Sequence, residues 1–156
     1  MDSNEFIDRT IQLALENVNS GRGGPFGALV VKDGKIIATG TNRVTATNDP
    51  TAHAEVVAIR NACQVLGNFE LTDCEIYCSC EPCPMCLGAI YWARPLRVFF
   101  AATAQAAADA GFDDSFIKTQ IALPYVQQEL PIKQLAHNEA LSPFNAWKAK
   151  PDKIAY

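Results

Sequence analysis

Apolar positions near the start of the chain repeat first with helical and then with strand spacing. Residues 3–20 place apolar side chains on one helical stripe, and Gly21 follows as a stop signal. Two apolar runs, about 26–32 and 35–41, are joined by the Asp-Gly dipeptide at 33–34, which is typical of a two-residue hairpin turn. These patterns predict a helix followed by a β-hairpin. The predicted helical stripe consists of Ile7, Ile11, Ala14, Leu15 and Val18.

Later segments alternate helical patterns with short strands. Asp49-Pro50 predicts a helix start, because aspartate caps helices and proline fits their first turn, and Gly67 ends that helix. A loop with two prolines begins another helix, which runs through Ala93. We therefore predict an α/β fold with a mixed sheet, in one domain that spans residues 1–156. Further strands are expected at 75–79, at 97–101 and at Ile132–Ala136, with an alanine-rich helix after the second of them.

Composition narrows the range of partners and compartments. The 156 residues suffice for one buried core, and the formal net charge is −4 with 13 scattered basic residues. Phosphate backbones attract clustered Lys and Arg, so this distribution argues against a nucleic-acid partner. No apolar run approaches the roughly 18 residues that a membrane span requires. The acidic start of the chain also lacks the pattern of a signal peptide, and we expect a cytoplasmic protein.

Four of the six cysteines fall within nine residues: Cys78, Cys80, Cys83 and Cys86. In a reducing cytosol such clustering favours metal binding or catalysis over disulfides. Two short motifs, His53-Ala54-Glu55 and Pro82-Cys83-Pro84-Met85-Cys86, fall at predicted helix starts. Because helix side chains lean toward the N-terminus, first-turn residues can reach a point just beyond the helix end.

One imidazole and two thiolates leave a fourth tetrahedral position on zinc open, which is the geometry of catalytic sites. We therefore predict one Zn²⁺ per chain, held by His53, Cys83 and Cys86. Zinc lowers the pKa of bound water from about 15.7 toward 7, and a carboxylate outside the metal shell can carry the proton to substrate. Glu55 is the candidate for this proton carrier. His-x-Glu followed by Pro-Cys-x-x-Cys is the signature of zinc nucleobase deaminases.

Other readings of these residues are structural. A closed zinc site needs a fourth ligand, and the other histidine, His137, lies in a distant polar stretch. The Cys80-x-x-Cys83-x-x-Cys86 run resembles part of an iron–sulfur motif, but no later cysteine completes it. Alone, Glu55 would be read as an acid that stabilises a helix start. Cys63, Cys74 and Cys78 are interpreted as small buried hydrophobic residues, and Cys80 as structural.

At these residues the sequence resembles the cytidine-deaminase-like superfamily and, more narrowly, the short bacterial guanine deaminases. The resemblance extends over nearly the whole chain. It implies a three-layer α/β/α sandwich with a five-stranded mixed sheet, and a homodimer whose C-terminal segments exchange between subunits. The segments that carry the resemblance are 23–28, 48–55, 79–95, 111–117 and 142–147.

The resemblance also implies a reaction, the hydrolysis of the free purine base guanine to xanthine and ammonia. Zinc hydroxide would attack the amino-bearing carbon, while Glu55 protonates ring N3 and later the ammonia, with Asp114 as a second acid. Among the base contacts, Phe26 would stack on the purine and Asn42 would hydrogen-bond it. Ala54, Trp92 and the terminal Tyr156, which would close over the partner's pocket, complete the implied substrate-binding set.

Three competing functions remain at this point. A tRNA adenosine deaminase shares the zinc motifs but would need a basic surface for its RNA. A cytosine or cytidine deaminase is more distant. A zinc-stabilised binding module without turnover would leave Glu55 and the open ligand position without a purpose.

Overall fold

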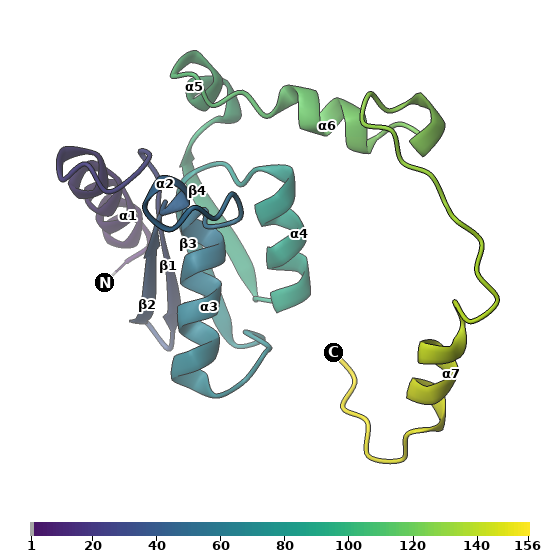
Figure 1. The fold of residues 1–156 in the computed structure, drawn as a ribbon. Helices are drawn as coiled ribbons and strands as arrows, with labels where there is room; N and C mark the ends of the chain where they lie inside the picture. The colour runs from purple at the N-terminus through teal and green to yellow at the C-terminus, as the bar shows by residue number, and fades with distance from the viewer. Residues whose placement is uncertain (1) are drawn as a thin grey trace. The chain divides into compact units, whose positions relative to one another are not determined.

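The structure is a computed structural model that describes residues 2–156 (Figure 1). Two compact units divide the chain, one up to Asp114 and one over Ser115–Tyr156. No helix in the described part of the chain is long and apolar enough to cross a membrane. The first unit contains α1 (Ser3–Asn19), β1 (Gly27–Lys32), β2 (Lys35–Thr41), α2 (Val44–Thr47), α3 (Ala54–Leu66), β3 (Cys74–Cys80), α4 (Pro84–Ala93), β4 (Arg97–Ala102) and α5 (Ala104–Asp109). The second contains α6 (Ser115–Ile121), the 3-10 turn η1 (Tyr125–Gln127) and α7 (Ser142–Ala149).

The sheet has the strand order β2-β1-β3-β4. The β1–β2 and β1–β3 pairs are antiparallel, and β3–β4 is parallel, so the predicted mixed sheet is confirmed. Helix α1 packs on one face of the sheet, and α3 and α4 cover the other (Figure 1). The three-layer α/β/α arrangement follows, because strand β1 is buried on both faces.

The hairpin forms as predicted. Asp33 and Gly34 both have positive φ, 50° and 70°, which is the backbone of the two-residue turn that matches the twist of paired strands. Gly34 tolerates this conformation without steric cost because it has no Cβ. The turn therefore fixes the register of β1 against β2.

Helix α1 also forms, but its buried face differs from the predicted stripe. Ile11, Leu15 and Val18 are exposed within the chain. The buried positions include two polar residues, because Thr10 donates to the Ile7 carbonyl and Asn17 donates to two loop carbonyls. A pattern built on apolar residues alone cannot show such satisfied polar groups. The buried face consists of Phe6, Thr10, Leu13, Ala14 and Asn17.

Two expectations about elements were wrong. The sheet has four strands among residues 2–156, and Ile132–Ala136 has no regular structure. A strand is stable only when another strand pairs with its backbone, and Leu135 in this segment is 80% exposed. The helix predicted from Asp49-Pro50 begins later, at Ala54. The Asp49 carboxylate accepts hydrogen bonds from the Thr51 N–H and hydroxyl, which closes a local turn in place of a helix cap.

Gly40 lets α3 approach the sheet closely. A Cβ at this position would lie 2.2 Å from the Ala54 carbonyl oxygen and 2.4 Å from the Ala58 nitrogen. Real side chains do not tolerate such distances, so the first turn of α3 rests directly on the β2 backbone. This contact places the start of α3 at the end of the sheet where the predicted site residues lie.

Candidate metal and catalytic site

His53 is the N-cap residue of α3 and has an extended backbone, with a φ of −69° and a ψ of 156°. The turn that precedes it is held by Asp49, and the His53 N–H donates to the Thr51 carbonyl at 2.8 Å. An exposed ion pair of 3.4 Å between Arg60 and Asp49 joins this turn to the body of α3. The loop therefore presents the imidazole ahead of the helix instead of along it.

Cys83 occupies the same position on α4, as its N-cap residue with Pro84 next in the chain. Its sulfur accepts the Cys86 N–H at 3.5 Å, so the cap itself brings the two cysteines together. Cys83 is half-buried and Cys86 is fully buried. A thiolate is favoured at a helix start, where the backbone N–H groups and the helix dipole stabilise negative charge.

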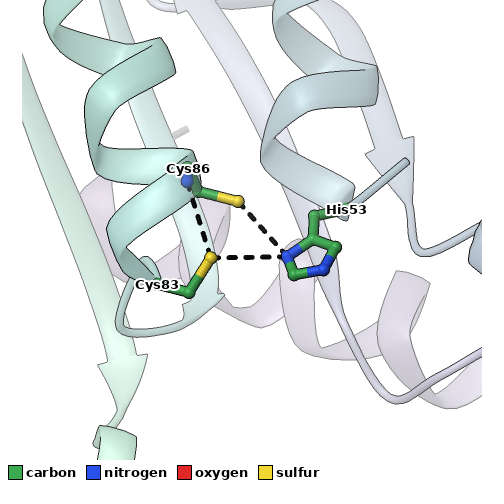
Figure 2. A group of neighbouring side chains, drawn as sticks. All are labelled: His53, Cys83 and Cys86. Atoms are coloured by element: carbon green, nitrogen blue, oxygen red, sulfur yellow. Dashed lines mark hydrogen bonds between the residues drawn. The ribbon is translucent and has the colours of Figure 1, made fainter. Parts of the chain in front are cut away.

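The three predicted ligands converge on one point (Figure 2). The His53 Nδ1 atom lies 3.5 Å from the Cys83 sulfur and 3.4 Å from the Cys86 sulfur. All three ligand atoms fall within 4.8 Å of one another. In tetrahedral zinc, bonds of about 2.3 Å to sulfur and 2.0 Å to nitrogen separate these atoms by about 3.6 Å. The donor set and its spacing therefore fit one zinc ion with one open position.

The charges of this group are coupled. The pKa of Cys83 is lowered to about 4, chiefly by a hydrogen bond from the Cys86 thiol and further by His53. The pKa of Cys86 is raised, because its proton is held against the Cys83 sulfur and because it is buried. The hydrogen bond to Cys83 also raises the pKa of His53 against the effect of burial. One thiolate is thus ready for a cation, and metal binding releases the remaining protons.

Glu55 lies beside the three ligands and outside their cluster. Its side chain is in the first turn of α3 and only 8% exposed. Burial raises the pKa of this carboxyl group, and the negative charge of Cys83 raises it further. An acid whose pKa is moved toward neutrality can both accept and donate a proton, which is what a general acid–base group requires.

A second cluster lies between α1 and the loops that follow β2 and α5. The rings of Phe26 and Phe112 meet edge to face with centroids 5.0 Å apart. The Asn42 side-chain oxygen accepts the Gly24 N–H at 3.4 Å and the Val44 N–H at 3.2 Å. These bonds orient the buried amide, so its NH₂ group is the end left to donate.

Residues 1–102 match the family described as the cytidine and deoxycytidylate deaminase zinc-binding region. The chain belongs to this family. It is 58% identical to the guanine deaminase of Bacillus subtilis (strain 168) over all 156 residues of both proteins. The X-ray structure of a guanine deaminase from Bacillus subtilis superposes with a TM-score of 0.98 at 58% identity, covering 100% of this chain and 99% of that one.

More distant family members cover part of the chain. A structure in complex with 2,6-diaminopurine is 34% identical with a TM-score of 0.67, and the match covers 70% of this chain and 61% of that one. The tRNA-specific adenosine deaminase of Agrobacterium fabrum (strain C58) is 46% identical over 78 residues, which is 50% of this chain and 51% of that protein. The sequence match to this tRNA enzyme therefore covers half of the chain.

The other expected site residues of this deaminase-family chain lie in separate parts of the structure. Ala54 is buried at the first position of α3, and Asp114 is half-buried at the end of the first unit. Trp92 is 65% exposed, nine residues beyond Cys83 on α4 and therefore about 13 Å along the helix. Tyr156 is exposed in the second unit. The roles of these residues stay predictions.

The sequence motifs do not predict a role for two residues of the second cluster, Phe112 and Asn17. Phe112 follows Gly111 in the segment that carried the family resemblance, so an aromatic residue after a glycine was the available signal. Asn17 had no such signal, since it is polar within a helix. Its NH₂ group donates to the Gly24 and Asn42 carbonyls at 2.9 Å each, which joins the two loops that hold Phe26 and Asn42.

Proposed function

We propose that this protein deaminates the free purine base guanine, taking up water and releasing xanthine and ammonia. The observation that carries the proposal is the convergence of His53, Cys83 and Cys86 with the buried carboxyl of Glu55 beside them. Full-length similarity to a guanine deaminase supports the choice of base. The reaction breaks the bond from C2 to the amino nitrogen and forms a C2–oxygen bond.

His53, Cys83 and Cys86 would hold the zinc ion. Bound zinc lowers the pKa of a coordinated water to about 7 and so supplies a hydroxide nucleophile at neutral pH. Glu55 would accept one proton from the attacking water and donate it to ring N3. It would then take the proton of the new C2 hydroxyl and donate it to the amino group, so that the C2 carbonyl forms as ammonia leaves. Its raised pKa suits both directions of transfer. Asp114 is proposed as a second acid near the leaving ammonia.

Base recognition is assigned to the second cluster. Phe26, held by Phe112, offers an aromatic face for the purine, and Ala54 forms part of the wall beside the metal. The Asn42 oxygen is already engaged by two backbone N–H groups, so its NH₂ group would donate to an acceptor on the base. Guanine has such an acceptor in its carbonyl oxygen, and adenine carries an amino group there.

The assembly is proposed to be a homodimer in which the segment 115–156 crosses to the other subunit and Tyr156 closes its pocket. Helix α4 is apolar around its whole circumference, yet Leu87, Tyr91 and Trp92 are exposed within one chain. Such a helix is normally covered on all sides, and a second copy offers the same face in return. Under this proposal the whole chain acts as one deaminase domain.

A groove on the opposite side of the sheet also supports exchange. It measures about 500 Å³ and lies beside α1, β4 and α5. The exposed residues Ile11, Leu15 and Val18 of α1 line it together with Phe112. Its walls are almost wholly apolar, so an apolar segment from the partner would bury them.

The proposed function is tested by incubating zinc-loaded protein with single free bases and nucleosides and measuring ammonia release. Guanine should react faster than guanosine, adenine, cytosine and cytidine, because a pocket closed around a base leaves no room for ribose. The Glu55→Gln variant serves as the matched control for contaminating activity. Preferred turnover of cytidine, or of adenosine in a tRNA stem-loop, would replace the guanine assignment. Absence of any turnover by zinc-loaded protein would make the chain a binding module.

A further inference from the structure

The strand end that leads to the metal ligands is bonded directly to the start of α5. The Glu81 carboxylate accepts the Ala104 N–H at 2.9 Å, and the Glu81 N–H donates to the Ala102 carbonyl at 2.8 Å. Between these two bonds, the Cys80 thiol donates to the Thr103 carbonyl at 3.6 Å. Residues 102–104, which end β4 and begin α5, are therefore held by Cys80 at the end of β3 and by Glu81 in the loop that leads to Cys83.

Strand β4 ends at Ala102, which pairs with Cys80 in the sheet, and beyond that residue few contacts fix the start of α5. No residue of the helix is buried, and its sequence, Ala104–Asp109, is mostly alanine. Small side chains with little burial supply little packing energy, so a helix of this kind depends on the hydrogen bonds at its ends. A carboxylate that accepts a backbone N–H at a helix start forms one of the stronger bonds of this type. The Thr103 hydroxyl, at the N-cap of α5, also accepts the Ala106 N–H.

The far end of α5 carries the aromatic residue of the second cluster. The Phe112 N–H donates to the Ala107 carbonyl at 2.9 Å, and Gly111 turns the chain with a φ of 96°. The Phe112 ring then meets Phe26 edge to face. The position of the Phe112 ring is thus determined by where α5 begins.

We propose that Glu81 is a positioning residue for base binding. Its carboxylate holds the start of α5, and α5 holds Phe112 against Phe26, which faces the purine in the proposed function on which this inference rests. Glu81 thereby couples the loop of the metal ligands to the wall of the base pocket without touching the substrate. This coupling gives a role to Glu81, an acid two residues before Cys83 whose carboxylate bonds α5.

The test removes each end of the same bond. Glu81→Ala removes the acceptor, and Ala104→Pro removes the donor at the first helical position, where proline is well tolerated. Each change should raise the KM for guanine about tenfold, as expected for the loss of a charge-assisted hydrogen bond, with zinc content unchanged. The double variant should be no worse than either single one, since both remove one interaction. Glu81→Gln keeps an acceptor oxygen and should restore most of the affinity.

The matched control is Glu70→Ala, which removes a partly exposed acid that pairs with Arg94 at the other end of α4. It should leave the KM unchanged. Amide hydrogen exchange of residues 104–112 gives a readout that does not depend on the substrate: exchange should be faster in Glu81→Ala than in Glu81→Gln. If the wild-type chain fails to deaminate guanine, the proposed function is wrong. The exchange difference still tests whether the Glu81 carboxylate holds the start of α5. Unchanged KM and unchanged exchange in both single variants would overturn the inference, as would additive effects in the double variant.

Discussion

Glu55 is buried two residues after His53 and lies outside the group of three candidate ligands. We expect Glu55→Gln to keep the zinc and the fold, since the amide has the same shape. Turnover of guanine should fall at least about 100-fold, the usual contribution of a positioned proton carrier. Zinc content by atomic absorption and kcat in one preparation check this. Loss of metal would make Glu55 a ligand, and near-normal kcat would move proton transfer to another group.

Cys83 and Cys86 contribute two of the three predicted metal ligands. Wild-type protein should contain about one zinc per chain, and Cys83→Ser or Cys86→Ser should lose metal and activity together, because a hydroxyl replaces the thiolate. Cys63→Ser is the control, since its thiol lies outside the cluster. Turnover by protein shown to be free of metal would contradict the mechanism.

At the scale of residues, the grouping of the three candidate ligands was predictable and the local backbone was not. The spacing of His53, Glu55, Cys83 and Cys86 constrains the chemistry, because few arrangements use one imidazole, two thiolates and a free acid. The Asp49 carboxylate could accept hydrogen bonds from the first N–H groups of a helix or from Thr51 in a local turn. The sequence does not distinguish these two arrangements. Phe112 depends on a long-range ring contact, which spacing along the chain does not reveal.

At the scale of elements, the contact between α3 and β2 depends on the absence of a side chain at Gly40. Gly40→Ala would press a methyl group into the backbone of α3, and we expect a loss of about 1–3 kcal/mol in the free energy of unfolding. Because α3 carries His53 and Glu55 at its start, turnover should fall as well. Urea denaturation with zinc bound measures the change.

The control for that substitution is Gly88→Ala, where a Cβ meets nothing within 4 Å of the same chain. Alanine favours helix over glycine by up to about 1 kcal/mol, so this variant should be at least as stable as the wild type. Equal stability of the two alanine variants would show that the close approach at Gly40 has no energetic weight.

Elements with strong local signals were predictable. The hairpin has a turn dipeptide that matches its geometry, and α3 ends at Gly67 with a positive φ of 60°, as predicted. The fifth strand was expected from a few apolar residues at 132–136, yet a strand exists only through a neighbour. The buried face of α1 depended on hydrogen bonds of Asn17 to loops, which apolar periodicity does not include.

At the scale of the molecule, the exposed face of α4 leads to a prediction about assembly. Wild-type protein should sediment as a dimer, and Leu87→Arg should shift it toward monomer, because a charge would be buried between two copies. Gln64→Arg, on the exposed side of α3, is the control and should not change the sedimentation coefficient. A monomeric wild type at micromolar concentration would remove the support for exchange.

The last residues give a second prediction at this scale. The tail after α7 consists of exposed residues, so it adds little to a core. Removing residues 153–156 should lower guanine turnover while the melting temperature and zinc content stay unchanged, as expected for a lid that excludes water from a pocket. Full activity of the shortened chain would leave Tyr156 without a role at the site.

Strand β4 lies at the edge of the sheet and is largely exposed, which has a consequence for how the protein matures. An open strand edge pairs with any chain that presents one. Under segment exchange, correct pairing and mispairing both need two molecules, so both accelerate with concentration. Active enzyme should therefore appear after a lag that shortens as more chains are present, and refolding yield should pass through a maximum at intermediate dilution.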